Sequence, residues 1–153
     1  MRVHIAADHA GFELREFLIE RLEGAGHEVI DHGAKDYDPM DAYPTMCIPA
    51  AEAVAADPGS LGIVIGGSGN GEQMAANLVD GIRAALVWNE STAVLAREHN
   101  DANVISIGAR QHTKEEAAHF VKVFLATQFS GDTRHKHRIG LMTKYEQERC
   151  KEK

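Results

Sequence analysis

The sequence predicts an α/β protein: one three-layer domain whose five-stranded parallel sheet carries helices on both faces. Short, nearly continuous apolar runs alternate along the chain with longer segments in which apolar residues recur at helical spacing. Strands buried on both faces have no polar side, so such runs are typical of parallel sheets. The chain has 153 residues and no internal repeat, and we therefore expect a single domain over residues 1–153.

The first half of the chain is expected to supply three strands and two helices. The strands are the short apolar runs at 2–7, 27–30 and 61–65. The first helix follows the first strand, has apolar residues at helical spacing, and is ended by Gly24 and Gly26. An alanine-rich second helix runs from residue 42 to about residue 56, and Pro49 should kink it or mark a later start.

The second half is expected to supply two more strands and several helices. The strands are the apolar runs at 82–88 and 104–107. Ser91 or Thr92 should cap the helix between these strands. Thr113 begins a Thr-x-x-Glu capping box that opens a helix to about Thr127. The charged tail over 134–153 carries an apolar stripe, which indicates a last helix that packs on a partner subunit.

The overall composition excludes several classes of function. A net charge of −7 argues against wholesale binding of nucleic acids or anionic membranes. No apolar run is long enough to span a bilayer, and the first residues lead into a strand without a signal-peptide pattern. Cys47 and Cys150 lie far apart and lack metal-site spacing, so we expect a cytoplasmic protein in which Cys47 is a buried, inert thiol.

A glycine-rich loop between the third strand and the next helix is the most informative stretch for function. Residues 66–71 contain four glycines, which let the backbone approach a ligand closely. The backbone N–H groups of such a turn can point at an oxyanion. Glu72 follows directly, and a carboxylate there would repel a phosphate. It is useful if the loop holds a negative charge that forms during a reaction and Glu72 is the base that creates it.

Two familiar nucleotide motifs do not fit this loop. Gly66 and Gly71 have Walker A spacing, but Glu72 and Gln73 replace the Lys and Ser/Thr that grip phosphate and magnesium. The G-x-G-x-G pattern after the third strand also differs from the dinucleotide fingerprint after a first strand. A tight turn followed by an exposed Glu, favoured by the helix dipole, is the alternative that needs no function.

Further polar residues follow the strands at the edge where ligands of parallel sheets bind. They are Asp8, His9, Ser68, Glu72 and Arg110. His99 and Asn100 lie at a helix end instead, so the fold or a second subunit must bring them to this group. Arg134 and Arg138 are four residues apart, which places them on one helix face, where with Arg110 they could grip a phosphate.

Each of these residues also has a plain structural explanation. Asp8 at a strand end could be a helix cap, and His9 and His99 could be surface histidines. His135 and His137 could suggest a metal, but they face opposite sides of a helix and no nearby thiol or carboxylate completes a site. The basic run over 134–138 could also be a solvated face.

Three separated motifs together resemble one family, the type B ribose-5-phosphate isomerases, which also includes galactose 6-phosphate and allose 6-phosphate isomerases. The motifs are residues 8–11, 66–77 and 97–110, in the family's order. The resemblance implies a Rossmann-like domain that forms a homodimer or a dimer of dimers, with the active site between subunits. It also implies interconversion of aldose and ketose phosphates through an enediolate, with no metal and no cofactor.

The resemblance also implies a role for each candidate residue. The catalytic group would be Glu72 as the proton shuttle between C2 and C1, His99 and Asp8 for ring opening, and Ser68 in the loop. Substrate binding would involve Gly67, Gly69, Asn70 and Gly71 at the enediolate, Asn100 at sugar oxygens, Tyr43 in the pocket wall, and His9, Arg110, Arg134 and Arg138 at the phosphate. Some members use a cysteine at the position of Gly66, so this chain resembles the branch with a glutamate base.

The leading hypothesis is therefore an isomerase of ribose 5-phosphate and ribulose 5-phosphate. One alternative keeps the mechanism and changes the substrate to a six-carbon sugar phosphate. A second alternative is a non-catalytic module that binds a phosphometabolite, since fold alone does not fix function. Leu78 departs from the family pattern, where many members carry a lysine. Glu72 favours the enzyme hypothesis over the binding-module hypothesis, because a protein that only binds anions gains nothing from a carboxylate at this position.

Overall fold

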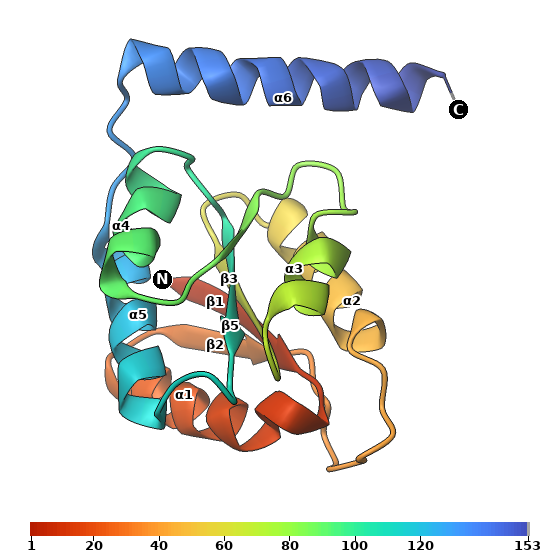
Figure 1. Cartoon of the computed structure of the whole chain (residues 1–153), viewed down its shortest axis with the longest axis vertical. Coiled ribbons are helices and arrows are strands. Elements are labelled where there is room, and N and C mark those ends of the chain that lie inside the picture. Colours follow the sequence, from red (N-terminus) through yellow and green to blue (C-terminus); the bar gives the residue numbers. More distant parts are fainter. Residues whose placement is uncertain (153) are drawn as a thin grey trace.

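The computed structural model describes residues 1–152, which form three layers with the sheet in the middle (Figure 1). All four strand pairs are parallel, and the strand order is β2-β1-β3-β5-β4. The strands are β1 (Arg2–Ala7), β2 (Glu28–Asp31), β3 (Leu61–Gly66), β4 (Ala84–Leu86) and β5 (Val104–Gly108). The predicted fold class, a single α/β domain with a five-stranded parallel sheet, is therefore confirmed.

Helices cover both faces of the sheet. A short 3-10 turn, η1 (His9–Gly11), leads into the first of them. The helices are α1 (Phe12–Gly24), α2 (Pro44–Ala55), α3 (Asn70–Ala76), α4 (Glu90–Glu98), α5 (Lys114–Ala126) and α6 (Thr133–Lys151). Helices α1, α4 and α5 lie on one face, and α2 and α3 lie on the other (Figure 1).

Two apolar cores explain why the strands are apolar along their whole length. Successive side chains of a strand point to opposite faces, so β3 sends Ile63 to the core under α1 and α5, and Val64 to the core under α2 and α3. Every residue of β3 is buried. Phe124 of α5 is completely buried in the larger core, and Cys47 of α2 is completely buried in the smaller one. The prediction of a buried Cys47 is confirmed.

The strand register brings three chain segments together at one edge of the sheet. Ala7 of β1 lies opposite Ile65 of β3, and Gly66 lies opposite Gly108 of β5. The three strands therefore end at the same level. The chain leaves β1 toward β2 on one side and returns to β3 on the other, so the edge between β1 and β3 is the switch point where such sheets bind ligands.

Most predicted elements are found, and three details differ. The capping box at Thr113 is confirmed, with Glu116 N–H donating to the Thr113 hydroxyl and Thr113 N–H to the Glu116 carboxylate, both at 3.1 Å. The cap of α4 is Asn89 rather than Ser91 or Thr92, because its side chain accepts the Thr92 N–H at 2.8 Å. Thr92 completes a reciprocal box with the Asn89 backbone.

The other two differences concern the second helix and the fourth strand. Helix α2 runs continuously through Pro49 and starts at Pro44, so the later start was wrong. Proline is favoured in the first helical turn, which explains why the helix begins at Pro44. Strand β4 is limited to Ala84–Leu86 and is shorter than the apolar run at 82–88, because only these residues pair with β5 at the sheet edge.

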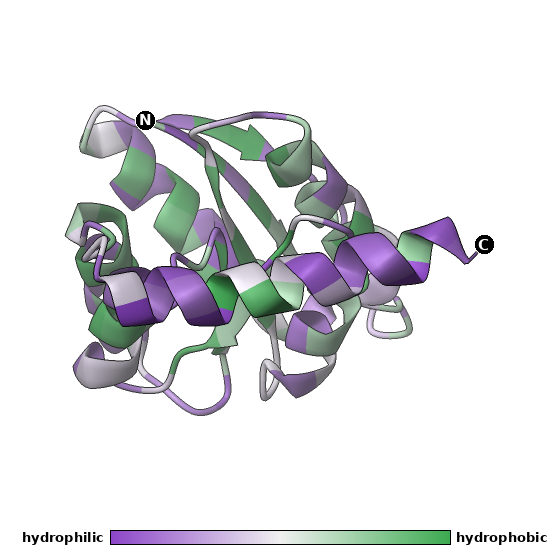
Figure 2. Ribbon diagram, turned by 90° about the horizontal axis from the view of Figure 1, so that it is seen from above, coloured by the Kyte–Doolittle hydropathy of each residue, from purple (hydrophilic) through white to green (hydrophobic). Residues whose placement is uncertain are grey.

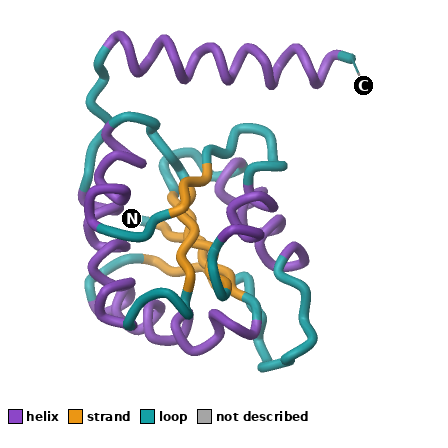
Figure 3. The backbone as a smooth tube through the Cα atoms, viewed as in Figure 1, coloured by secondary structure: helices purple, strands orange, loops and turns teal. Residues whose placement is uncertain are grey.

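Helix α6 stands apart from the three layers and lies across one side of the molecule (Figures 1 and 3). His135 is its one buried residue within the described part of the chain. The C-terminal part of α6 contacts the loop before β4, where the Gly81 N–H donates to the Glu146 carboxylate at 3.0 Å. Leu141, Met142 and Tyr145 of α6 stay exposed, and Figure 2 shows a short hydrophobic stretch in the middle of this helix between polar ends. Within residues 1–152, no helix is long and apolar enough to cross a membrane.

The cap of α4 can be tested with a matched pair of substitutions. Asn89→Ala removes the acceptor for the Thr92 N–H and should lower the free energy of unfolding by about 1 kcal/mol. Ser91→Ala alters an exposed residue in the first turn and should stay within about 0.5 kcal/mol of wild type. Urea denaturation of the three proteins measures both. Equal losses in the two variants would contradict Asn89 as the cap.

Candidate active site

A pocket of about 460 Å³ opens at the sheet edge where β1, β3 and β5 end. Its lining comes from the loops after these three strands and from the start of α2: Asp8, His9, Ala10, Tyr43, Gly67, Ser68, Gly71, Glu72, Arg110 and Gln111. The residues expected at this edge from the sequence are thus brought together. The parallel register is the cause, because it ends all three strands at one level.

Hydrogen bonds from β5 fix the glycine-rich loop. The Ser106 hydroxyl donates to the Gly69 carbonyl at 2.7 Å, and the Ala109 N–H donates to the Gly66 carbonyl at 2.7 Å. Gly69 caps α3 in the left-handed conformation with φ of 85°, where a side chain would be strained. The exposed Ser68 accepts the Asn70 N–H at 3.2 Å, so its hydroxyl supports the loop from the solvent side.

Glu72 is buried, with 4% of its surface exposed, and its carboxyl group lies directly over Gly66. A Cβ atom at position 66 would fall 1.7 Å from Glu72 Oε1, so only glycine leaves room for this carboxyl group. The sequence alternative of an exposed Glu in the first turn is therefore wrong. The glycine at 66 and the glutamate at 72 occupy the same space and depend on each other.

The surroundings of Glu72 favour its neutral form. Burial raises the pKa of the Glu72 carboxyl group, and the nearby Asp8 carboxylate raises it further. The backbone N–H groups of Glu72 and Gly69 act in the opposite direction, but the net pKa remains raised. Burial raises the pKa of the Cys47 thiol, and the Glu72 and Asp8 carboxylates raise it further, so the thiol stays protonated and inert.

Asp8 serves as a cap and also faces the pocket. Its Oδ1 accepts the N–H groups of Ala10 at 2.9 Å and Gly11 at 3.3 Å, which begins η1. The residue is 6% exposed and lines the pocket beside Glu72. Both hydrogen bonds use one oxygen, so the second oxygen is available to a ligand. The two sequence explanations for Asp8, cap and catalytic group, are therefore compatible.

Tyr43 and Arg110 form the walls on either side of the glycine loop. A Cβ atom on Gly71 would lie 2.4 Å from Tyr43 Cζ, so the tyrosine ring packs directly on the backbone of Gly71. A Cβ atom on Gly67 would lie 3.2 Å from Arg110 Nη1, so the guanidinium group lies over Gly67. Arg110 is exposed and is the cation of this pocket. An anionic group of a ligand is expected at its side of the pocket.

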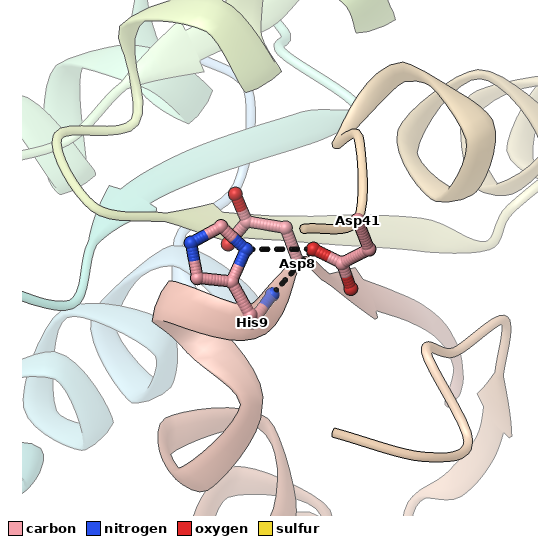
Figure 4. Close-up of side chains that lie close together, drawn as sticks. All are labelled: Asp8, His9 and Asp41. Atoms are coloured by element: carbon pink, nitrogen blue, oxygen red, sulfur yellow. Dashed lines mark hydrogen bonds and ion pairs between the residues drawn. The ribbon is translucent and has the colours of Figure 1, made fainter. Parts of the chain in front are cut away.

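His9 is held by Asp41, a residue that the sequence analysis missed. The His9 Nδ1 atom lies 2.7 Å from Asp41 Oδ1, and the His9 backbone N–H donates to the same oxygen at 3.0 Å (Figure 4). Asp41 belongs to a polar loop with several other carboxylates. No spacing rule separates it from them, so only the structure identifies it.

One group of side chains within residues 1–152 has the arrangement of a metal site. Asp8, His9 and Asp41 each place a ligand atom within 4.8 Å of the others. One oxygen of each carboxylate is already engaged, because Asp8 Oδ1 accepts two N–H groups and Asp41 Oδ1 accepts two hydrogen bonds from His9. The expectation that the protein works without a metal stays a prediction, and chelation tests it.

Of the predicted site residues, Gly69 and Asn70 belong to the glycine-rich loop but do not line the pocket, and four others lie far from it. His99 and Asn100 follow α4, and the Asn100 carbonyl accepts a hydrogen bond from Arg83, which directly precedes β4. They are therefore near the amino ends of the strands, whereas Glu72 is at the carboxyl ends. A six-residue strand such as β3 spans roughly 20 Å. One chain does not bring His99 and Asn100 to the pocket.

Arg134 and Arg138 accompany His99 rather than Arg110. Both are exposed on α6, and the intervening His135 is buried with its ring stacked on His99 at a centroid distance of 4.1 Å. Burial lowers the pKa of His135, and His99 lowers it further, which favours a neutral stacked ring. His99, Asn100, Arg134 and Arg138 thus form a second group at the opposite edge of the molecule, which we call the distal group.

Comparison with known proteins gives consistent matches over nearly the whole chain. The model of a family described as Ribose/Galactose Isomerase matches residues 3–142. A protein named ribose-5-phosphate isomerase B from Mycobacterium tuberculosis is 56% identical over 146 residues, which cover 95% of this chain and 90% of the relative. The crystal structure of ribose-5-phosphate isomerase B from Mycoplasma genitalium, with bound ribulose-5-phosphate, has a TM-score of 0.93 at 40% identity, covering 96% of this chain and 97% of that one.

The buried carboxyl group predicts an unusual dependence of stability on pH. Because the pKa of Glu72 is raised on folding, the folded state binds more protons between the ordinary carboxyl pKa and the raised value. Stability contributed by protonated Glu72 is therefore lost as pH rises through that interval. Glu72→Gln should be more stable than wild type at pH 8 by about 0.5–2 kcal/mol. The difference should shrink toward pH 4, near the ordinary carboxyl pKa of about 4.3.

Glu116→Gln is the matched control for this prediction, to be measured by urea denaturation at both pH values. The Thr113 N–H and hydroxyl lower the pKa of Glu116, so its charged form stabilises the folded state and the variant should lose stability at pH 8. Opposite signs in the two variants are expected. A loss of stability for Glu72→Gln at pH 8 would show that its charged form is favoured in the pocket.

Proposed function

The chain belongs to the Ribose/Galactose Isomerase family, and from this premise we propose that it interconverts D-ribose 5-phosphate and D-ribulose 5-phosphate. Relatives named ribose-5-phosphate isomerase B match it over at least 95% of its length, and one of them holds ribulose-5-phosphate in its crystal structure. The observation that carries the proposal is Glu72, a buried carboxyl group of raised pKa that faces a pocket with an arginine. A binding module for anions would gain nothing from that group.

The chemistry assigned to Glu72 is a proton transfer between C2 and C1. Its carboxylate takes the proton from C2 of the open-chain aldose, and the C1 carbonyl becomes the oxyanion of an enediolate. The proton then returns to C1, the hydroxyl proton on O2 passes to the oxyanion on O1, and the carbonyl forms at C2, which gives the ketose. A raised pKa suits this exchange, because the same group must accept and release a proton near neutral pH. Backbone N–H groups of the loop over 67–71 would stabilise the oxyanion.

The remaining roles require a second copy of the chain. We assign ring opening to His99 with Asp8, and phosphate binding to Arg110, Arg134 and Arg138 with His9. The pocket contains Asp8, His9 and Arg110, whereas the distal group holds His99 and the other two arginines. A two-fold dimer would complete two equivalent sites by joining each pocket to the partner's distal group. The exposed apolar stripe of α6 supports such an interface.

The surface between α6 and the edge strand also favours dimer formation. A hollow of about 660 Å³ lies there, and its lining includes Leu86, Trp88 and Met142. Trp88 is 57% exposed and Met142 is 49% exposed, and clustered exposed apolar side chains are typical of subunit interfaces. We assign this face to the partner subunit.

We further place the enzyme in a reducing cytoplasm, since no disulfide joins the buried Cys47 to the distant Cys150.

The proposed reaction is tested by measuring ketose formation from ribose 5-phosphate in the presence of EDTA. The wild-type protein should convert ribose 5-phosphate to the ketose. The Glu72→Gln variant should remain folded and should lose about 10²- to 10⁴-fold in kcat. Glu116→Gln, which removes a surface carboxylate, is the control and should keep full activity. Loss of wild-type activity with EDTA would contradict a metal-free mechanism. Activity on allose 6-phosphate alone would keep the mechanism and change the substrate.

The shared active site is tested by mixing two inactive variants. Glu72→Gln damages the pocket, and His99→Asn damages the distal group. In a mixed dimer one of the two sites joins an intact pocket to an intact distal group, so the purified mixed dimer should show about half of wild-type activity. The variants are co-expressed with different tags and the mixed dimer is purified. If each site lay within one chain, the mixed dimer would stay inactive.

A further inference from the structure

We propose that Asp41 is a positioning residue that fixes the tautomer and direction of the His9 ring, so that Nε2 of this histidine is presented to the substrate phosphate. The inference rests on the proposed function for the identity of the ligand. It concerns a residue outside the three sequence motifs of the family resemblance. Asp41 lies in the loop before α2 and does not line the pocket itself.

The contact between the two side chains determines which ring nitrogen carries a hydrogen. A carboxylate only accepts hydrogen bonds, so the 2.7 Å contact with Asp41 Oδ1 requires a hydrogen on His9 Nδ1. The second nitrogen, Nε2, lies on the other side of the ring, away from Asp41 (Figure 4). His9 lines the pocket together with Arg110, and when the ring is charged its Nε2 is a donor that suits a phosphate oxygen there.

Asp41 holds both the backbone and the ring of His9. The same Oδ1 accepts the His9 backbone N–H at 3.0 Å, so the two hydrogen bonds together restrict both side-chain torsions of the histidine. The His9 side chain is 25% exposed, and a ring at this exposure would otherwise rotate. Fixing the ring before binding lowers the entropy lost when a ligand is bound.

Burial of Asp41 is costly and therefore calls for an explanation. Its side chain is 12% exposed, and within residues 1–152 its Oδ2 atom is buried without a hydrogen-bond partner. Burying a carboxylate oxygen without a donor costs free energy, and no contribution to the apolar core offsets this. Orientation of His9 is a function that would retain such a residue.

The loop that carries Asp41 is anchored at its opposite end. Ala7 N–H donates to the Gly33 carbonyl at 2.8 Å, and Ala34 N–H donates to the Ala7 carbonyl at 2.9 Å. The buried Arg15 side chain donates to the Ala34 carbonyl and lies 3.4 Å from the Asp31 carboxylate. These bonds join the start of the loop to β1 and α1, the elements on either side of His9. The position of Asp41 is thus built into the fold.

The test compares Asp41→Asn with Asp38→Asn, a matched change at an exposed carboxylate of the same loop. Asp41→Asn should raise KM for ribose 5-phosphate about 10- to 100-fold, by analogy with the carboxylate partners of metal-binding histidines, and should change kcat little. Asp38→Asn should leave both constants unchanged. In a His9→Gln background, Asp41→Asn should add no further rise in KM, because the two residues act as one unit.

Nitrogen NMR of the histidine rings gives a readout that does not depend on activity. The His9 signal is identified by its loss in His9→Gln, and in wild type it should show hydrogen on Nδ1. Asp41→Asn should lose this preference and should weaken the shift of the His9 signal on titration with inorganic phosphate. An unchanged tautomer, or a KM effect that persists in the His9→Gln background, would overturn the role of Asp41.

The two measurements separate failure of this inference from failure of the proposed function. If wild type turns over no sugar phosphate, the proposed reaction is wrong, and the tautomer with the phosphate titration still decides the role of Asp41. If wild type is active and Asp41→Asn matches Asp38→Asn in KM and tautomer, the reaction stands and the inference is wrong. A drop in kcat at constant KM would assign Asp41 a different role.

Discussion

Hydrogen bonding between the parallel strands β1, β3 and β5 decides where every group of the pocket lies. Because Ala7 pairs with Ile65 and Gly66 with Gly108, the loops after the three strands emerge at one level. The glycine loop is then bonded to β5 through Ser106 and Ala109. A shift of one residue in any of these pairings would exchange the two faces of a strand and move Glu72 out of the pocket.

Two carboxyl groups, Glu72 and Asp8, are buried without a cationic partner within residues 1–152, and this burial is the main destabilising feature of the structure. Glu72 and Asp8 lie close together with little exposure, and burial together with the Asp8 carboxylate raises the pKa of Glu72. The apolar cores on the two faces of the sheet supply the stability that tolerates this arrangement. A carboxyl group that a core would exclude is useful where a proton must be taken and returned, so this destabilising burial lies where the proposed proton transfer needs it.

The candidate residues form two groups, and the strand direction separates them. Residues that follow strands gather at the carboxyl edge, whereas residues that follow α4 return to the amino edge because the helix runs back across the sheet. Helix α6 lies outside the three layers, along one side of the molecule, and carries the two arginines of the distal group (Figure 1). The stacked rings of His99 and His135 join α6 to the end of α4. The proposed site residues of one chain therefore lie in two separate groups, the pocket and the distal group.

The sequence alone located the strands, because burial on both faces produces a continuous apolar run, although it made β4 too long, and it singled out Glu72 from its place beside four glycines. It also predicted the Thr113 capping box, since that signal is local. It misplaced the cap of α4 and missed Asp41, because the partner of a polar side chain is set by chain segments that the sequence does not show to be near. Burial of Glu72 over Gly66 and separation of His99 from the pocket followed only from strand register and direction, which are properties of the folded chain.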